Sequence, residues 1–251
     1  VTLELAAQLD YPGASPRLTV VPAKDGNEYL YHLNTRETFR MRIEQGGLTL
    51  DPDWVARFDP YGTGQEENEE PTSPVVVDGR VFYTTNTVFS VTDPMRIFWQ
   101  DVETLYRKEH SPLTGPELFA GVEGGGWSFF SIAIDEFTGI VVSADQGNGL
   151  LTAVRAIGDN EIERLWQIDL NASASPVIVS DREMVYVNDF VDGRDHLVVL
   201  DLTTGEEILR VPTPATRATI SEIIVSSANE VYFGSNEPGQ PIGLFHRIYV
   251  P

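Results

Sequence analysis

Short apolar stretches recur five times along the chain, and each is followed after a turn by a second apolar stretch. The first members are rich in β-branched residues and occupy residues 18–21, 75–77, 132–134, 177–179 and 223–225. The second members carry Tyr at four of five equivalent positions, which are Tyr31, Tyr83, Val142, Tyr186 and Tyr232. Because β-branched and aromatic residues favour strands, the pattern predicts an array of similar strand-rich units.

The period of this pattern points to a β-propeller. The residues just before the five first strands recur at intervals of ~45 to ~58, close to the length of a four-stranded blade; they are Pro16, Pro74, Ser131, Pro176 and Glu222. We therefore predict an all-β propeller of five four-stranded blades. The last repeat has room for three strands, so the alternating segment 2–9 is expected to complete it as an N-terminal closing strand. The alternative is a chain that forms part of a seven- or eight-bladed ring.

We expect one propeller domain covering residues 1–251. The repeats are assigned approximately to residues 15–72, 73–127, 128–173, 174–219 and 220–251, the last together with 1–10. The irregular region 103–127 is long for a connection in a compact domain, and such loops are usually functional. Within it, Trp127 is either a platform for a stacked ligand or a buried anchor of the insertion.

The charge balance excludes several classes of partner. The chain carries 38 acidic and 17 basic residues, a formal net charge of -21, and a surface of this kind repels phosphate backbones and anionic lipids. We expect no nucleic-acid partner and no membrane insertion, since no apolar run of about 18 residues is present. The chain begins with Val1 rather than Met, so we expect a processed or partial chain. With no cysteine, it has neither disulfides nor thiolate chemistry.

The fourth repeat carries a recognisable turn. The segment Leu-Val-Val-Leu-Asp-Leu-Thr-Thr-Gly-Glu at 197–206 resembles the signature of pyrroloquinoline-quinone-like propeller repeats, in which a third strand enters a tight turn. Asp201 and Thr204 are suited to accept hydrogen bonds from turn amides, and Gly205 to adopt a positive φ. In that family a Trp ending each repeat packs between neighbouring blades. The resemblance implies this role for Trp99 and Trp166, with Leu209 as the replacement in the fourth repeat and Trp54 as the counterpart in the first.

The catalytic part of that family does not carry over. Its quinone-dependent dehydrogenases are known for a vicinal cysteine disulfide and a calcium site beside the quinone, and this chain has no cysteine. The resemblance therefore implies the non-catalytic branch. We predict a non-catalytic extracytoplasmic scaffold, periplasmic or secreted, whose loops bind a protein or glycan partner. The alternative is an enzyme centred on the propeller channel, either a glycoside hydrolase with paired carboxylates or a degenerate quinoprotein dehydrogenase.

One set of polar residues is a candidate ligand site. Three positions after the equivalent second-strand residues named above stand Asn34, Asn86, Asp145, Asp189 and Ser235. In a propeller these oxygen-bearing side chains recur on one face, where they suit a polar ligand or a hard cation such as calcium. The competing interpretation is that they are ordinary hairpin-turn residues. We expect no cofactor, with calcium as the alternative, and no catalytic residue is assigned.

Overall fold

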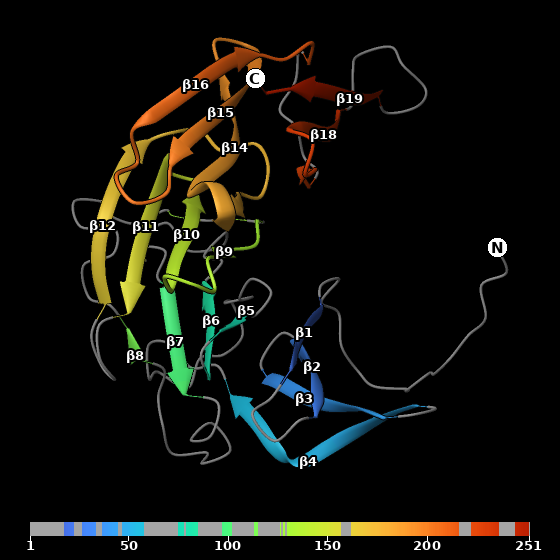
Figure 1. The fold of residues 1–251 in the computed structure, drawn as a ribbon. Coiled ribbons are helices and arrows are strands. Elements are labelled where there is room, and N and C mark those ends of the chain that lie inside the picture. The colour runs from blue at the N-terminus through green and yellow to red at the C-terminus, as the bar shows by residue number, and fades with distance from the viewer. Residues whose placement is uncertain are drawn as a thin grey trace, which may run out of the picture. The chain divides into compact units, whose positions relative to one another are not determined.

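The computed structural model describes residues 18–22, 27–33, 37–44, 47–57, 75–77, 79–84, 97–101, 113–114, 126, 128, 130–156, 162–215, 222–235 and 244–250. This part of the chain is all-β, as predicted, and its one described helix is the three-residue 3-10 turn η2 (Ser180–Arg182). No helix within these ranges is long and apolar enough to cross a membrane. Figure 1 shows the strands as arrows. The chain divides into two compact units, each described here by itself.

The first unit, Val1–Asn86 with Ile97–Thr114, contains two antiparallel sheets among its described residues. The strands of one are β1 (Leu18–Pro22), β2 (Glu28–Leu33), β3 (Glu37–Glu44) and β4 (Gly47–Arg57). Those of the other are β5 (Val75–Val77), β6 (Arg80–Thr84), β7 (Ile97–Asp101) and β8 (Leu113–Thr114). In both sheets each strand pairs with the next one along the chain, which is the meander expected of a propeller blade.

The second unit, Thr87–Arg96 with Gly115–Pro251, contains three such meanders. The third sheet has strands β9 (Ala133–Ile134), β10 (Ile140–Asp145), β11 (Leu150–Ala156) and β12 (Ile162–Asp169). The fourth has β13 (Val177–Val179), β14 (Met184–Val191), β15 (Arg194–Asp201) and β16 (Glu207–Pro212). The fifth has β17 (Ile224–Val225), β18 (Glu230–Ser235) and β19 (Leu244–Tyr249).

The predicted strand positions are confirmed in all five repeats. Each predicted first strand overlaps β1, β5, β9, β13 or β17, and each second strand overlaps β2, β6, β10, β14 or β18. The fifth sheet has three strands among the described residues, as expected. The predicted closing strand, residues 2–9, lies outside the described residues. The number of blades, the closure of the ring and the single domain therefore stay predictions.

Two apolar clusters form the core of the second unit. One lies between the third and fourth sheets and includes Val142, Leu151, Trp166 and Leu200. The other lies between the fourth and fifth sheets and includes Tyr186, Leu197, Val231 and Phe233. Strands β14 and β15 of the fourth sheet lie between the two clusters. Their side chains alternate between the two faces of the sheet, so each strand contributes residues to both clusters.

The turn predicted at 201–205 has the expected chemistry. Oδ1 of Asp201 accepts hydrogen bonds from the backbone N–H of Thr203 at 2.9 Å and of Thr204 at 2.7 Å. Gly205 adopts φ +72°, the left-handed conformation that other residues resist. Hydrogen bonds hold the pKa of Asp201 below its ordinary value, and the largest effect comes from the backbone N–H of Thr204. Burial alone would raise this pKa. This carboxylate therefore stays ionised and stabilises the turn.

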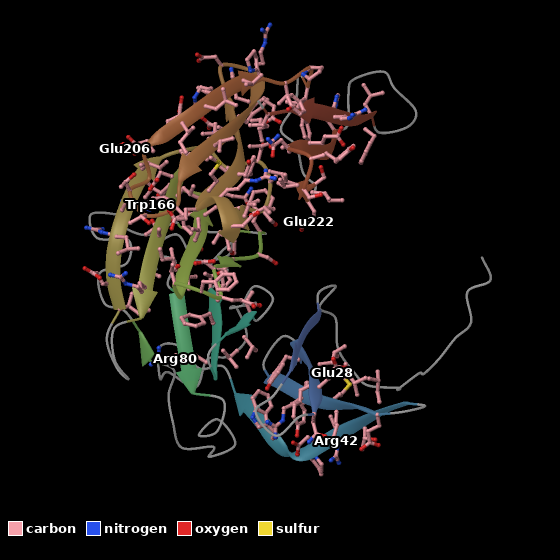
Figure 2. The ribbon with its side chains drawn as sticks, viewed as in Figure 1. Glu28, Arg42, Arg80, Trp166, Glu206 and Glu222 are labelled. Atoms are coloured by element: carbon pink, nitrogen blue, oxygen red, sulfur yellow. The ribbon has the colours of Figure 1, made fainter. Side chains whose placement is uncertain are left out.

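Trp166 packs against this turn from the preceding sheet, as the resemblance implied. Its Nε1–H donates to the carbonyl oxygen of Leu202 at 2.9 Å. A Cβ built on Gly205 would lie 2.7 Å from Cδ2 of the indole, so only glycine fits beneath the ring. Figure 2 labels Trp166 beside the turn that continues to Glu206.

The other three residues expected to take the packing role of this Trp are Leu209, Trp54 and Trp99, and the structure describes them to different extents. Leu209 pairs with Val199 in the fourth sheet as Trp166 pairs with Ala153 in the third, which confirms that Leu209 takes the Trp position. Trp54 is buried, and its ring meets Tyr31 of its own sheet edge to face at 5.2 Å between centroids. Trp99 lies in β7, but its side chain is outside the described residues.

Candidate functional site

In the second unit, two serines and a glutamate occupy equivalent positions just before the first strand of their sheets. Val142 pairs with Ala133, Tyr186 with Val177, and Tyr232 with Ile224, so these pairs mark equivalent positions in the third, fourth and fifth sheets. Counting two residues back from each first-strand partner reaches Ser131, Ser175 and Glu222. This corrects the alignment made from sequence, which placed Pro176 opposite Ser131 and Glu222. The difference of one residue arose because the local pattern locates a strand but does not fix which residues of the neighbouring strand it pairs with.

Hydrogen bonds link these three equivalent residues across three sheets. The backbone N–H of Ser131 donates to Oγ of Ser175 at 3.3 Å. The hydroxyl of Ser175 then donates to Oε1 of Glu222 at 3.2 Å. Glu222 is exposed, and Figure 2 labels it on the segment that enters the fifth sheet. We call Ser131, Ser175 and Glu222 the inner-strand line, because each lies at the start of the first strand of its sheet.

A buried carboxylate supports this end of the fourth sheet. Asp195 is fully buried and accepts hydrogen bonds from the Ser173 hydroxyl at 2.7 Å and from Nδ2 of Asn188 at 2.5 Å. Its backbone also bonds to the segment that follows β16, through the N–H of Thr213 and the carbonyl of Ala215. A buried charge is tolerated only when donors surround it, so this network fixes the segment that leads to Ser175.

The predicted ligand residues of the second unit have separate partners. Asp145, the last residue of β10, accepts from the backbone N–H of Asn148 at 3.2 Å and from its Nδ2 at 2.8 Å. It therefore holds the tight turn between β10 and β11, which agrees with the turn interpretation. Ser235 ends β18, and its hydroxyl oxygen lies 2.6 Å from Nε2 of His246 on β19.

Asp189 does not fit the turn interpretation. It lies inside β14, and the hairpin turn comes later, at Asp192 and Gly193, which both have positive φ. The Asp189 carboxylate forms an ion pair with Arg210 at 2.6 Å and accepts from the N–H of Asn171 at 2.9 Å. Sequence reasoning missed this pairing because Arg210 is 21 positions away, on a strand that is not adjacent to β14.

The remaining predicted site residues, Asn34, Asn86 and Trp127, lie outside the described residues. Within the described ranges, no group of three or more His, Cys, Asp or Glu side chains is arranged to hold a metal ion. The expectation of no cofactor, with calcium binding by the five predicted ligand residues as its alternative, stays a prediction. The sequence analysis used Ser131 and Glu222 only as repeat markers, and it assigned no site role to Ser175.

Two aspartates whose pKa values are lowered, Asp135 and Asp201, lie at the opposite end of their sheets. Asp135 begins the turn between β9 and β10 and accepts hydrogen bonds from the N–H and the hydroxyl of Thr138. Burial raises the pKa of Asp135, but hydrogen bonds from Ser180 and Thr138 outweigh it, so the pKa lies below the ordinary aspartate value. Like Asp201, this group stabilises a turn. The inner-strand line is the candidate functional site because its carboxylate is exposed.

No family model matches the sequence, and no curated protein matches it. Solved structures match its fold. A luciferin-regenerating enzyme superposes with a TM-score of 0.53 at 10% identity, over 93% of this chain and 78% of its own. The periplasmic gluconolactonase of Pseudomonas aeruginosa gives 0.55 at 12% identity, over 92% and 73%. A protein from Lactobacillus plantarum gives 0.55 at 13% identity, over 82% and 60%.

These structures are β-propeller-like, so the chain has a propeller-like fold. At such low identity the likeness shows the fold alone, and the pyrroloquinoline-quinone-like assignment stays a prediction. The predicted non-catalytic scaffold gains no support, because two of the three proteins bear the names of enzymes.

Proposed function

We propose that the chain is a propeller-type hydrolase that opens a sugar lactone or a similar polar ester, with Glu222 as the general base. The observation that carries the proposal is the inner-strand line, which ends in an exposed carboxylate that Ser175 orients through a hydrogen bond of 3.2 Å. The name of the periplasmic gluconolactonase of similar fold supports the choice of substrate class. It also agrees with the extracytoplasmic location predicted from the sequence.

The step needs only water as the second reactant. The Glu222 carboxylate takes a proton from a water molecule while the water oxygen attacks the lactone carbonyl carbon. The ring C–O bond then breaks, and the proton passes from Glu222 to the departing alkoxide oxygen. The product is the hydroxy acid, and Glu222 returns to its ionised form. General-base assistance of this kind contributes about 10²–10⁴-fold to rate.

The rest of the line positions the base. Ser175 donates to Oε1 of Glu222 and so orients the carboxylate. The N–H of Ser131 donates to Oγ of Ser175, which directs the serine proton toward Glu222. The buried Asp195, with Ser173 and Asn188, fixes the backbone that leads to Ser175. Ser175 is a positioning residue in this scheme.

The experiment is a pH-stat assay of glucono-1,5-lactone opening above its spontaneous rate, run beside a panel of nitrophenyl esters and nitrophenyl glycosides. We expect acceleration with the lactone or the esters. Ser175→Ala should retain a pH profile of the same shape with a rate reduced severalfold. Activity on glycosides alone would favour the paired-carboxylate alternative, and no hydrolysis of any substrate would contradict the proposal.

A further inference from the structure

Where the third and fourth sheets meet at the turn 201–205, the slot between them holds the indole of Trp166. Trp166, 7% exposed, reaches from β12 across the fourth sheet's turn, and its Nε1–H donates to the carbonyl of Leu202 at 2.9 Å. The ring lies against Gly205, where no Cβ fits. This slot shows what kind of group fits between two sheets of this chain: a planar bicyclic ring.

The corresponding slot between the fourth and fifth sheets has no indole among the residues that line it. Leu202 and Val250 are equivalent, because the N–H of each donates at 2.8 Å to the carbonyl of a left-handed residue, Glu183 and Asn229 respectively. Leu209 stands at the position of Trp166 in the strand register. A leucine is smaller than a tryptophan and has no donor, so part of this slot is left unfilled.

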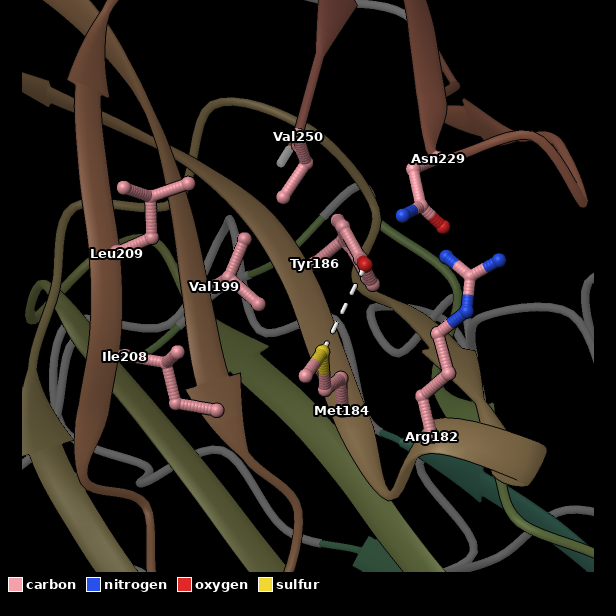
Figure 3. A pocket seen from close by; sticks show the side chains of 8 residues that line it. All are labelled: Arg182, Met184, Tyr186, Val199, Ile208, Leu209, Asn229 and Val250. Carbon is pink, nitrogen blue, oxygen red and sulfur yellow. Dashed lines mark hydrogen bonds between the residues drawn. The ribbon is translucent and has the colours of Figure 1, made fainter.

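A cavity of 250 Å³ lies in this slot. Eight residues line it, namely Arg182, Met184, Tyr186, Val199, Ile208, Leu209, Asn229 and Val250. An engineered cavity of about 150 Å³ binds benzene, so this cavity has room for a bicyclic aromatic ring. Figure 3 shows Leu209 and Ile208 on one side and the polar ends of Arg182 and Asn229 next to each other on the other.

The polar side of the cavity carries the guanidinium of Arg182, one nitrogen of which has no hydrogen-bond partner. Arg182 donates from one guanidinium nitrogen to the carbonyl of Ser227 at 3.1 Å, while its other terminal nitrogen is buried without a hydrogen-bond partner. Among the described residues Arg182 forms no ion pair, although the chain as a whole has a net charge of -21. A carboxylate is the group that best satisfies such a guanidinium.

We propose that this cavity, which we call the Leu209 pocket, binds a small aromatic carboxylate. The ring takes the place that Trp166 has in the preceding slot, against Val199 and Leu209, and the carboxylate pairs with Arg182 after a rotation of its guanidinium. The site lies between the fourth and fifth sheets and does not include Glu222. It is therefore independent of the proposed hydrolase and fits an effector or carried ligand.

The test is isothermal titration calorimetry at pH 7 with indole-3-acetate and with indole, on the full chain. We expect wild type to bind both, and Arg182→Gln to weaken indole-3-acetate about tenfold while changing indole less than about twofold. Leu209→Trp should abolish binding of both, because its own ring fills the pocket. Arg155→Gln, an arginine on β11 paired with Glu163 at 2.9 Å, is the charge control and should bind as wild type.

Three results would overturn the proposal. They are no binding of either probe by wild type, unchanged binding by Leu209→Trp, and an equal loss for both probes in Arg182→Gln. Circular dichroism and the urea midpoint establish that each variant is folded. If Leu209→Trp does not fold, Leu209→Phe replaces it, and the comparison of the two probes in Arg182→Gln decides independently.

Discussion

Trp166 and Gly205 meet across the boundary between the third and fourth sheets, and the space between them excludes even a methyl group. A Cβ on Gly205 would lie 2.7 Å from Cδ2 of the indole, and the φ of Gly205 is +72°. Two separate constraints, backbone conformation and steric exclusion, therefore require glycine at this position.

Gly205→Ala should lower the free energy of unfolding by about 2–3 kcal/mol, because the methyl group meets the ring and the left-handed conformation is strained. Gly193→Ala is the matched control, since Gly193 has the same φ of +72° but nothing within 4 Å of its Cβ position. Its loss should be about 1 kcal/mol. Urea unfolding measures both. Equal losses would show that the ring does not constrain Gly205.

Trp166→Phe should cost about 1–2 kcal/mol of unfolding free energy beyond the loss of packing. The change removes the Nε1–H and leaves the buried carbonyl of Leu202 without this donor. Tyr186→Phe is a suitable comparison, because the hydroxyl that it removes makes only a weak bond of 3.7 Å to Met184 Sδ. That variant should stay within about 0.5 kcal/mol of wild type. An unchanged unfolding free energy in Trp166→Phe would argue against a stabilising hydrogen bond from Trp166 to the carbonyl of Leu202.

Asp195→Ala should destabilise the chain by about 3 kcal/mol, because the Ser173 hydroxyl and the Asn188 amide both lose their buried acceptor. Asp181→Ala, on the exposed turn η2, should have little effect on the unfolding free energy. Chemical denaturation of the two variants makes the comparison. If both changes are equally mild, the Asp195 network does not fix this end of the fourth sheet.

The lowered pKa of Asp201 predicts that the free energy of unfolding depends on pH. Its pKa is lower in the folded chain than in the unfolded chain, first because the backbone N–H of Thr204 donates to it. The stability that it contributes is therefore present above the unfolded pKa, about 4, and is lost as the pH falls through the folded value. The advantage of wild type over Asp201→Asn in unfolding free energy should shrink below about pH 4. A constant difference from pH 7 to pH 3 would contradict this.

Local sequence was sufficient to predict the strands and one complete turn. The β-branched and Tyr pattern located strands such as β5 and β13 because strand preference is a local property. The turn at Asp201 and Gly205 was predictable for the same reason, since its hydrogen bonds lie within four residues. The position of Trp166 was predictable only through the family resemblance, because its partner lies 36 residues away.

The candidate site and the pocket were not predictable from the sequence. The inner-strand line depends on strand register, and a difference of one residue moved Ser175 out of alignment with Ser131 and Glu222. The Asp195 network depends on donors 22 and 7 positions away in the sequence, Ser173 and Asn188. The Leu209 pocket arises from the absence of an indole, which a single sequence marks only as an ordinary leucine.

The most direct test of the proposed function compares two glutamates in the lactone assay. Glu222→Gln removes the base at the end of the inner-strand line, whereas Glu206→Gln changes an exposed glutamate on the turn at the opposite end. We expect kcat to fall by about 10²–10⁴-fold in Glu222→Gln. It should remain near the wild-type value in Glu206→Gln. A kcat of Glu222→Gln equal to that of wild type would contradict the assignment of Glu222 as the base.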